Sequence, residues 1–521
     1  MSNSDKVYFP RLGITKADVV RYFPSSGTGS SEPCIELYAL IGDRVMAASA
    51  SAFGPLQGAI AGDVILPGSR DYESMRTPSI ARFHDVRPQA VVLCRTPMDV
   101  AQTISFASRS GLETATRSGG HCFAGRSSTR GVVVDVSPMH AVSVSDGVAT
   151  VGAGARLGEV YDALYDHDLT IAAGCGPSVG IAGLTLGGGL GILGRKHGLT
   201  SDQLVAAEVV LADGRVVECD VHHEEGLFWA LRGAGGGNFG VVTSFVFRTI
   251  PAPTATSLHL VWPHVHAASA IEAWQAWAPA APDELAASLL VTAAGDVDQP
   301  PVVHLFGAML GTEADTAELL AELIGRAGAD PTSAFLKHMS HRETKRYLAE
   351  HGPGDDQHDA TSPDEPSHQG LAYSKSEFFG RPLPTEAIAA LVEHLENGRV
   401  AGRSHQLDFT PWSGAYNRVR DDATAFVHRA ERFLLKHEVV VDPDASMAER
   451  ESARAWLTRS WALVHPWGSG RVYPNFPDPD LEDWAHAYYG TNYGRLLRVK
   501  AKYDPGNVFR FHQSLPSRPV T

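Results

Sequence analysis

The residues best suited to chemistry in this 521-residue sequence lie in one short turn, Thr116 to Gly125, which reads TRSGGHCFAG. Small residues around a single histidine favour a tight turn, in which backbone N–H groups converge on an anion such as a pyrophosphate. Ser118 adds a hydroxyl donor, and His121 would face the bound anion as a candidate nucleophile. An ordinary glycine turn with a histidine on the surface is the alternative interpretation, because a short glycine motif is only weak evidence for a binding site.

Two more glycine-rich runs follow this turn. Eight glycines fall among the twenty residues from Ala172 to Gly191, and another cluster occupies residues 233–240. Glycines separated by apolar residues indicate close backbone approach, either to a flat ligand or to another chain segment. The Rossmann fingerprint fits poorly, because its GxGxxG joins the first strand to the first helix and these glycines lie in three separate places.

Strand and helix patterns alternate around the glycines. Short β runs are expected at 90–93, 132–136 and 243–248, with helices from Thr96 to Ser110 and from Gly154 to His167. The run from Val205 to Cys219 predicts a β-hairpin around an Asp-Gly turn. These elements would hold the glycine turns between strands and helices.

The second half of the chain begins at Pro251-Ala252-Pro253, which we interpret as a domain boundary in a chain longer than the usual single domain. Beyond it, strand-like and helical segments mix, which indicates an α+β second domain. Helices are expected at about 423–437 and around 452–460. Residues 351–370 are polar and acidic and predict a mobile loop. Residues 1–32 predict an N-terminal extension that ends in a disordered Ser/Gly linker.

The composition of the sequence limits which binding partners and which cellular location we expect. A net charge of −15, from 59 acidic and 44 basic residues, disfavours nucleic acid or an anionic membrane as a partner. Five widely spaced cysteines without a CxxC pair argue against a disulfide framework or a zinc site, and no HExxH spacing predicts a metal. The sequence shows neither a signal-peptide pattern nor an apolar run long enough to span a membrane, so we expect a soluble, cytoplasmic protein.

Together the motifs resemble one family, the FAD-linked oxidases of the vanillyl-alcohol oxidase type, in its berberine-bridge-enzyme-like branch. The matching segments are RSGGH at 117–121, VGIAGLTLGGGLG at 179–191, WALRGAGGGNFGVVTSF at 229–245 and YYGTNYGRLLRVKAKYDPGNVFRFHQSL at 488–515. The resemblance covers roughly residues 67–516 and implies an α+β fold. It implies an FAD-binding domain of the PCMH type with two subdomains at 67–252, a substrate domain with an antiparallel sheet at 253–480, and a C-terminal return to the FAD domain at 481–516.

The resemblance also implies how FAD is held: the first turn binds the pyrophosphate, and His121 attacks the flavin 8α-methyl group to form a covalent bond. The implied cofactor-binding residues are Arg117, Ser118, Gly119, Gly120, His121, Cys122, Gly174, Cys175, Gly176, Val179, Gly180, Gly183, Gly187, Gly188, Gly240, Val241, Val242, Asn492 and Tyr493. Many relatives bond flavin C6 through a cysteine directly before the proline. Here Gly176 precedes Pro177 and Cys175 lies one place earlier, where extended backbone would turn the thiol to the opposite face. We therefore expect one covalent bond, unless the local turn compensates for the offset.

Hydride removal from an alcohol carbon also requires a base for the hydroxyl proton. Relatives often place a tyrosine at the end of a Tyr-x-Asn-Tyr motif, but here the motif ends in Phe476, which cannot accept a proton. Other relatives use a carboxylate on a strand of the substrate domain, and Asp408 occupies the corresponding region. A merely exposed strand carboxylate is the alternative interpretation of Asp408, and Tyr473 and Tyr416 are further candidates.

The leading hypothesis is an FAD-linked oxidase that transfers hydride to flavin N5 from a hydroxyl-bearing sugar, alcohol or natural product of secondary metabolism. Molecular oxygen would then reoxidise the flavin and give hydrogen peroxide. Two alternatives stay open: a flavin dehydrogenase with another acceptor, and a non-catalytic flavoprotein, which Phe476 suggests. The substrate is not identified, because pocket residues come from separate strands of the second domain.

Overall fold

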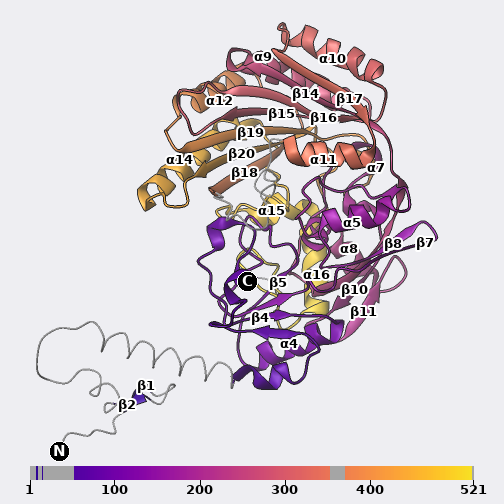
Figure 1. The fold of residues 1–521 in the computed structure, drawn as a ribbon, viewed down its shortest axis with the longest axis vertical. Helices are drawn as coiled ribbons and strands as arrows, with labels where there is room; N and C mark the ends of the chain where they lie inside the picture. Colours follow the sequence, from indigo (N-terminus) through magenta and orange to yellow (C-terminus); the bar gives the residue numbers. More distant parts are fainter. Residues whose placement is uncertain (1–6, 10–13, 16–51, 352–369, 519–521) are drawn as a thin grey trace, which may run out of the picture.

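A computed structural model describes residues 7–9, 14–15, 52–351 and 370–518. The predicted extension at 1–32, apart from strands β1 (Val7–Phe9) and β2 (Ile14–Thr15), lies outside the described residues, as do 352–369 of the predicted loop. Figure 1 shows two bodies, one built from the first part of the chain and its C-terminal segment, the other around a long sheet.

The first body contains a four-stranded sheet in the order β3 (Asp63–Ile65), β4 (Ala90–Leu93), β6 (Val132–Asp135), β5 (Thr114–Arg117). Strands β4 and β5 both pair with β6 in parallel, and parallel strands require a crossover connection. Helix α4 (Pro97–Arg109) supplies it between β4 and β5, and a capping box of Thr96 and Asp99 fixes its start. The turn at 117–125 follows β5 directly, so this sheet positions it.

A five-stranded antiparallel sheet completes the first body. Its order is β11 (Val216–Cys219), β10 (Leu204–Val210), β12 (Val241–Arg248), β8 (Val148–Gly152), β7 (Val142–Ser145). This body also includes the pair β9 (Leu169–Thr170) and β13 (Ile250–Pro251) and, among its helices, α5 (Leu157–Tyr165), α6 (Ile181–Leu186), α8 (Glu225–Leu231), α15 (Trp484–Tyr489) and α16 (Tyr493–Tyr503). The glycine-rich run at 174–191 includes α6 and its flanks, and the third run ends at β12.

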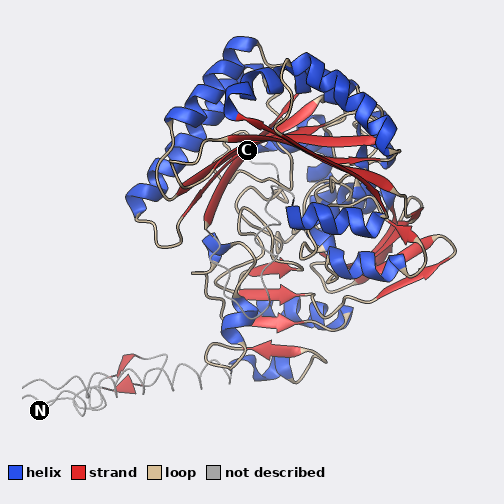
Figure 2. Cartoon of the chain, turned by 45° about the horizontal axis from the view of Figure 1, so that its top comes forward, coloured by secondary structure: helices blue, strands red, loops and turns tan. Residues whose placement is uncertain are grey.

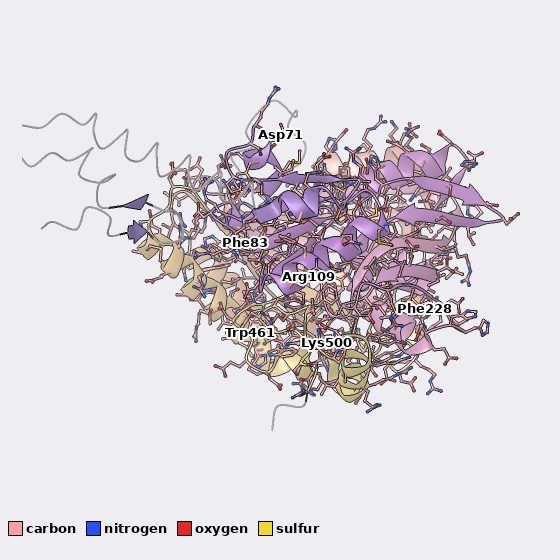
Figure 3. The ribbon with its side chains drawn as sticks, turned by 90° about the horizontal axis from the view of Figure 1, so that it is seen from below. Asp71, Phe83, Arg109, Phe228, Trp461 and Lys500 are labelled. Carbon is pink, nitrogen blue, oxygen red and sulfur yellow. The ribbon has the colours of Figure 1, made fainter. Side chains whose placement is uncertain are left out.

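The C-terminal segment packs into this first body. Lys500 of α16, labelled in Figure 3, is fully buried, and its ammonium donates to the carbonyls of Asn238 (2.7 Å) and Phe509 (2.6 Å) and pairs with Asp504 (2.7 Å). Removing a charge from water is costly unless it is fully hydrogen-bonded, as this one is. The contact ties residues beyond 490 to the third glycine run.

The second body is built around a seven-stranded antiparallel sheet. Its order is β17 (Ser333–Met339), β14 (Ala255–Pro263), β16 (Val302–Met309), β15 (Leu285–Ala293), β19 (Arg403–Pro411), β20 (Phe433–Val441), β18 (Leu371–Phe379). Figure 2 shows helices covering one face of it; these are α9 (Ala267–Trp277), α10 (Glu313–Ala327), α12 (Thr385–Asn397) and α14 (Met447–Val464). Helix α11 (His341–His351) lies toward the first body (Figure 1).

Side-chain alternation gives the two faces of this sheet opposite characters. Along β19, Leu407 and Phe409 are fully buried in the core beneath the helices, whereas Gln406 and Asp408 are only half-buried. Because successive strand residues point to opposite faces, Gln406 and Asp408 share the face turned away from the helices. We call this the open face of the sheet.

The fold class expected from the resemblance is confirmed, with an FAD-binding domain of the PCMH type and an antiparallel second-domain sheet. The domain boundaries at 253 and 480 stay predictions. The helix expected at 423–437 is wrong, because residues 433–441 form β20. That strand is buried over nearly all its length although Lys436, His437 and Glu438 occupy its middle. Its sequence therefore shows neither the alternation nor the unbroken apolar run that would indicate a strand. No helix in the described part of the chain is both long and apolar enough to cross a membrane.

Candidate active site

A cavity of about 790 Å³ lies between the glycine-rich turns and the open face of the seven-stranded sheet. The first body contributes residues 113–129 and parts of the stretches 174–190 and 235–242 to its wall, and the C-terminal segment contributes 509–513. The second body contributes Asp408 and Lys436, and the loop Tyr473 to Pro477 closes the wall between them. Three separate glycine motifs thus meet at one cavity.

The first two glycine turns cross each other with their backbones in contact. A Cβ atom added to Gly119 or to Gly180 would overlap the backbone nitrogen of the other residue. The Ser118 hydroxyl donates to the carbonyl of Ala153 (2.8 Å), so its proton is used within the protein and is not available to an anion as we had expected. Part of the glycine content therefore serves chain packing, which was one of the two interpretations of the sequence.

Other glycines of the same runs open onto the cavity. Gly183 and Gly235 line its wall, and apart from neighbouring backbone no atom of the described residues lies within 4 Å of the position that a Cβ would take at either residue. Smooth backbone surfaces of this kind, next to turns rich in N–H donors, suit a flat ligand with an anionic tail. The shape, the glycine surfaces and the donor set of this cavity fit FAD.

His121 is oriented by a neighbouring hydroxyl. Its Nε2 lies 2.8 Å from Ser178 Oγ, which belongs to the second glycine turn. A hydrogen bond at one ring nitrogen fixes the ring and selects its tautomer. Arg117, by contrast, uses its guanidinium inside the protein, where it donates to the carbonyls of Met75 (2.6 Å) and Ser127 (3.0 Å). Arg117 therefore holds the turn in shape instead of contacting an anion with its side chain.

Cys175 also lines the cavity, on the side of the second body. Its sulfur lies 4.0 Å from Nζ of Lys345, a buried residue of α11. The same ammonium donates to the carbonyls of Ala173 and Gly174, each at 2.8 Å, and to the Tyr161 hydroxyl at 2.9 Å. Sequence inspection missed Lys345, because nothing in the helical pattern of α11 marks a lysine that docks onto another domain.

Across the cavity, Asp408 and Lys436 are direct partners on neighbouring strands. They face each other in the register of β19 and β20, and both line the cavity. Thr410 donates to Asp408 Oδ1 at 3.3 Å, and Lys436 lies 3.2 Å from Glu438 Oε2. The open face thus presents a carboxylate and an ammonium toward the turns. Lys436 was not predicted, since only the strand register brings it beside Asp408.

Phe476, which replaces the expected tyrosine, lies against the Lys436 ammonium. Its ring centroid lies 5.3 Å from Lys436 Nζ and 5.7 Å from the ring of Phe123, edge to face. Tyr473 lines the same wall, and its hydroxyl accepts hydrogen bonds from the N–H groups of Gly189 (3.0 Å) and Leu190 (3.1 Å). Burial raises the pKa of Tyr473 to about 12, so it is protonated at neutral pH and is a poor base.

Most of the predicted cofactor residues line the cavity. They are Arg117, Ser118, Gly119, Gly120, His121, Cys122, Gly174, Cys175, Gly176, Val179, Gly180, Gly183, Gly240, Val241 and Val242. Their individual roles toward FAD stay predictions.

Five predicted residues lie away from the cavity wall: Gly187, Gly188, Tyr416, Asn492 and Tyr493. The Tyr416 hydroxyl is hydrogen-bonded to the backbone of Gly191, and Gly187 and Gly188 pack against Asn475 and Phe426. The Asn492 amide donates to the carbonyl of Asp421 (2.7 Å), and Tyr493 stacks on Tyr489. These residues support the walls from behind. No cluster of His, Cys, Asp and Glu side chains suited to a metal ion occurs among the residues that the structure describes.

Comparison with known proteins agrees with this geometry. Residues 88–220 match the model of an FAD binding domain, and residues 472–516 match the model described as berberine and berberine like. The FAD-linked oxidoreductase YvdP of Bacillus subtilis is 33% identical over 470 residues, which are 88% of this chain and 98% of that protein. Chitooligosaccharide oxidase of Gibberella zeae is 29% identical over 446 residues, 82% of this chain and 87% of that protein.

A solved structure shares the whole architecture. Glucooligosaccharide oxidase from Acremonium strictum, which is described with a 6-S-cysteinyl, 8α-N1-histidyl FAD, superposes with a TM-score of 0.79 at 27% identity. The alignment covers 90% of this chain and 100% of that one. With the matched family models, the three converging glycine motifs and the cavity that fits FAD, the chain belongs to the berberine-bridge-enzyme-like family of FAD-linked oxidoreductases.

Proposed function

We propose that this enzyme is an oxidase that removes hydride from the hydroxyl-bearing carbon of a small organic substrate, with molecular oxygen as the final acceptor. The observation that carries the proposal is the placement of Asp408, a half-buried carboxylate on the open face of the sheet, in the same cavity as the His121 turn. The sugar oxidases among the similar proteins support an alcohol as the substrate class.

FAD would be held by the crossing turns at 117–122 and 174–183 and by the third run at 235–242, with His121 as its covalent anchor. When bound, FAD supplies the acceptor for the hydride and a reduced form that oxygen reoxidises. Backbone N–H groups near the 174–180 turn would stabilise the negative charge of the reduced cofactor. The likeness to a protein described with a histidyl bond supports the anchor.

Asp408 acts as the base that takes the proton of the substrate hydroxyl. A positioned carboxylate of this kind contributes roughly 10²- to 10⁴-fold to a rate. Lys436, which faces Asp408 across the strands and lies 3.2 Å from Glu438 Oε2, brings a positive charge to this part of the open face. The rings of Phe123 and Phe476 lie beside the Lys436 ammonium and keep water from it. Phe476 therefore has a role in the site without accepting a proton.

The test is a screen of sugars and alcohols for peroxide release, followed by Asp408→Asn on the best substrate. We expect kcat to fall by roughly 10²- to 10⁴-fold while the protein stays yellow. Asp442→Asn, which changes an exposed carboxylate just beyond β20, is the matched control and keeps full activity. An unchanged kcat in Asp408→Asn would show that the base lies elsewhere.

The dehydrogenase and the non-catalytic flavoprotein make different predictions in the same assays. Slow reaction of the reduced protein with air in stopped-flow would replace the oxidase by a dehydrogenase with another acceptor. If no alcohol bleaches the flavin anaerobically, the catalytic proposal itself fails. The cytoplasmic location stays a prediction.

A further inference from the structure

A second cavity, of about 230 Å³, lies beside the main one and plays no part in the proposed reaction. It is enclosed by the short helix η2 (Ala81–Phe83), the edge strand β18, helix α14 and the loop at 478–480. Ala124 and Pro479 line both cavities, so the two are direct neighbours. Figure 3 labels Phe83, one of its wall residues.

The wall of this side cavity carries more positive than negative charge. Lys375 pairs with Asp478 at 2.5 Å, and Arg454 pairs with Asp480 at 2.8 Å. The third cation of the wall, Arg82, forms no ion pair with any residue that the structure describes. Three cations against two carboxylates leave one positive charge, and it resides on Arg82.

Arg82 also has hydrogen-bond donors to spare. Its guanidinium carbon lies 4.9 Å from the ring centroids of both Phe83 and Tyr373, and Nη2 donates to the carbonyl of Phe123. Within the described ranges, its Nε and Nη1 groups make no hydrogen bond. A guanidinium presents five N–H groups in a fork that matches a carboxylate, and Arg82 lines the side cavity.

We infer that the side cavity binds the carboxylate group of a small organic acid, with Arg82 as its principal donor. The rings of Phe83 and Tyr373 and the side chain of Leu457 offer apolar surface to the body of the acid. The acid group belongs either to the substrate itself, reaching past Ala124 from the main cavity, or to a separate molecule. In both cases Arg82 connects the site to the His121 loop through the Phe123 carbonyl.

The test measures calorimetric binding of benzoate, and of its neutral isostere benzamide, to the full-length, flavin-containing protein. We expect benzoate to bind at least about tenfold more tightly, because only a carboxylate accepts a charge-assisted pair of bonds from arginine. Arg82→Met removes this preference. Arg109→Met, which changes the exposed arginine labelled in Figure 3, preserves it. If Arg82→Met loses its flavin, Arg82→Lys replaces it and weakens benzoate binding severalfold, because the fork is lost.

Equal affinities for benzoate and benzamide, or for the original protein and Arg82→Met, would overturn the inference. A second experiment separates the two sources of the acid group. If 4-(hydroxymethyl)benzoate bleaches the flavin anaerobically and benzyl alcohol does not, the site holds the carboxylate of the substrate. If neither bleaches it while benzoate still binds, the site holds a separate acid. Only this second experiment rests on the proposed oxidase function; the binding measurement stands without it.

Discussion

His121 and Cys175 lie on two glycine turns that line one cavity, yet the two turns are held in different ways. The His121 turn is fixed from within the first body, by the Ser178 hydroxyl on the imidazole and by Ser79 on the Gly119 carbonyl. The Cys175 turn is held from both bodies, by the Tyr161 hydroxyl, which donates to the Gly174 carbonyl, and by the buried ammonium of Lys345. Arg117 and the two serines thus hold the first turn from within the first body, whereas the second turn also depends on a charge carried by α11.

This difference separates the two residues that could bond to a flavin. The hydrogen bond that orients His121 and the bond to the Gly119 carbonyl come from Ser178 and Ser79, and neither involves a residue of α11. The position of Cys175 depends on the docking of α11, and its side chain packs beside Ile192 and Tyr347 at the boundary between the bodies. We therefore assign the anchoring of FAD to His121 and expect the Cys175 turn to respond to changes at the domain interface.

The largest effect is expected from His121→Ala, which should release all the flavin. After acid precipitation, the yellow colour should move from the protein pellet to the supernatant, whereas the original protein stays yellow. Cys122→Ala, a change in the same turn, is the matched control and should retain the colour. A yellow His121→Ala pellet would show that a second residue bonds to the flavin and would reverse the ranking of the two turns.

Lys345→Met should destabilise the protein and leave the His121 turn unaffected. The change leaves the Ala173 carbonyl without the hydrogen bond from Lys345, and a buried group left unsatisfied costs about 1–3 kcal/mol. Urea unfolding should show a free energy of unfolding lower by about this amount, while the flavin stays bound to the pellet in acid. Arg346→Met, an exposed neighbour on the same helix, should behave like the original protein. Equal stability of the two variants would remove Lys345 from the account of the Cys175 turn.

The docking of α11 should also weaken in acid, because His341 of that helix is buried between Tyr161 and Tyr165. Burial, and then the nearby Lys345, lower the pKa of His341 to about 3. The unfolded chain takes up this proton near pH 6.5 and the folded protein does not, so stability is full above pH 6.5 and falls as the pH drops toward 3. At pH 5 the loss from this residue alone is about 2 kcal/mol.

His341→Phe should reduce this acid sensitivity, because phenylalanine fills the space between the tyrosines without a titrating group. Unfolding free energies measured from pH 7 to 5 should then fall less steeply than in the original protein. His222→Gln, at an exposed histidine, should leave the slope unchanged. If the slope in His341→Phe is unaltered, other buried histidines cause most of the loss of stability in acid.

The comparison of the turns also shows where sequence information was sufficient. Each glycine motif is local, so its letters were enough to show the family resemblance. That resemblance implied that the turns share one ligand, and Gly119, Gly180 and Gly183 do line one cavity. The predictions for Asn492 and Tyr493 extended a motif to residues that support the wall from behind, because a motif does not say which side faces the ligand.

Lys345 and Lys436 were out of reach for a different physical reason. Their positions depend on the docking of α11 and on the register of β19 with β20, contacts between segments far apart in the chain. The two-residue alternation of side chains along a strand predicts which face of the sheet a residue occupies. It does not predict which residue lies opposite on the neighbouring strand.

Ser178→Ala should slow the attachment of flavin without preventing it. One hydrogen bond to the imidazole contributes about 1 kcal/mol to holding the ring in its reactive orientation. Its loss should raise the activation free energy of attachment by about this amount, which is roughly a fivefold decrease in rate. The measurement is the fraction of flavin that survives acid precipitation at successive times after FAD is added to flavin-free protein. Ser178→Thr keeps the hydroxyl and should restore the rate. If Ser178→Ala attaches flavin as fast as the original protein, the hydroxyl does not orient His121.

The smallest effect is expected from Cys175→Ala. The sulfur lies beside Lys345 on the side of the second body, and its one-residue offset from the position before Pro177 argues against a bond to the flavin. The absorption spectrum of Cys175→Ala should match that of the original protein, and the flavin should stay with the pellet in acid. A changed spectrum would show that the turn compensates for the offset and that the flavin carries two bonds, as described for the glucooligosaccharide oxidase. The double variant His121→Ala/Cys175→Ala distinguishes one covalent bond from two. If His121 forms the single bond to the flavin, the double variant releases no more flavin than His121→Ala alone.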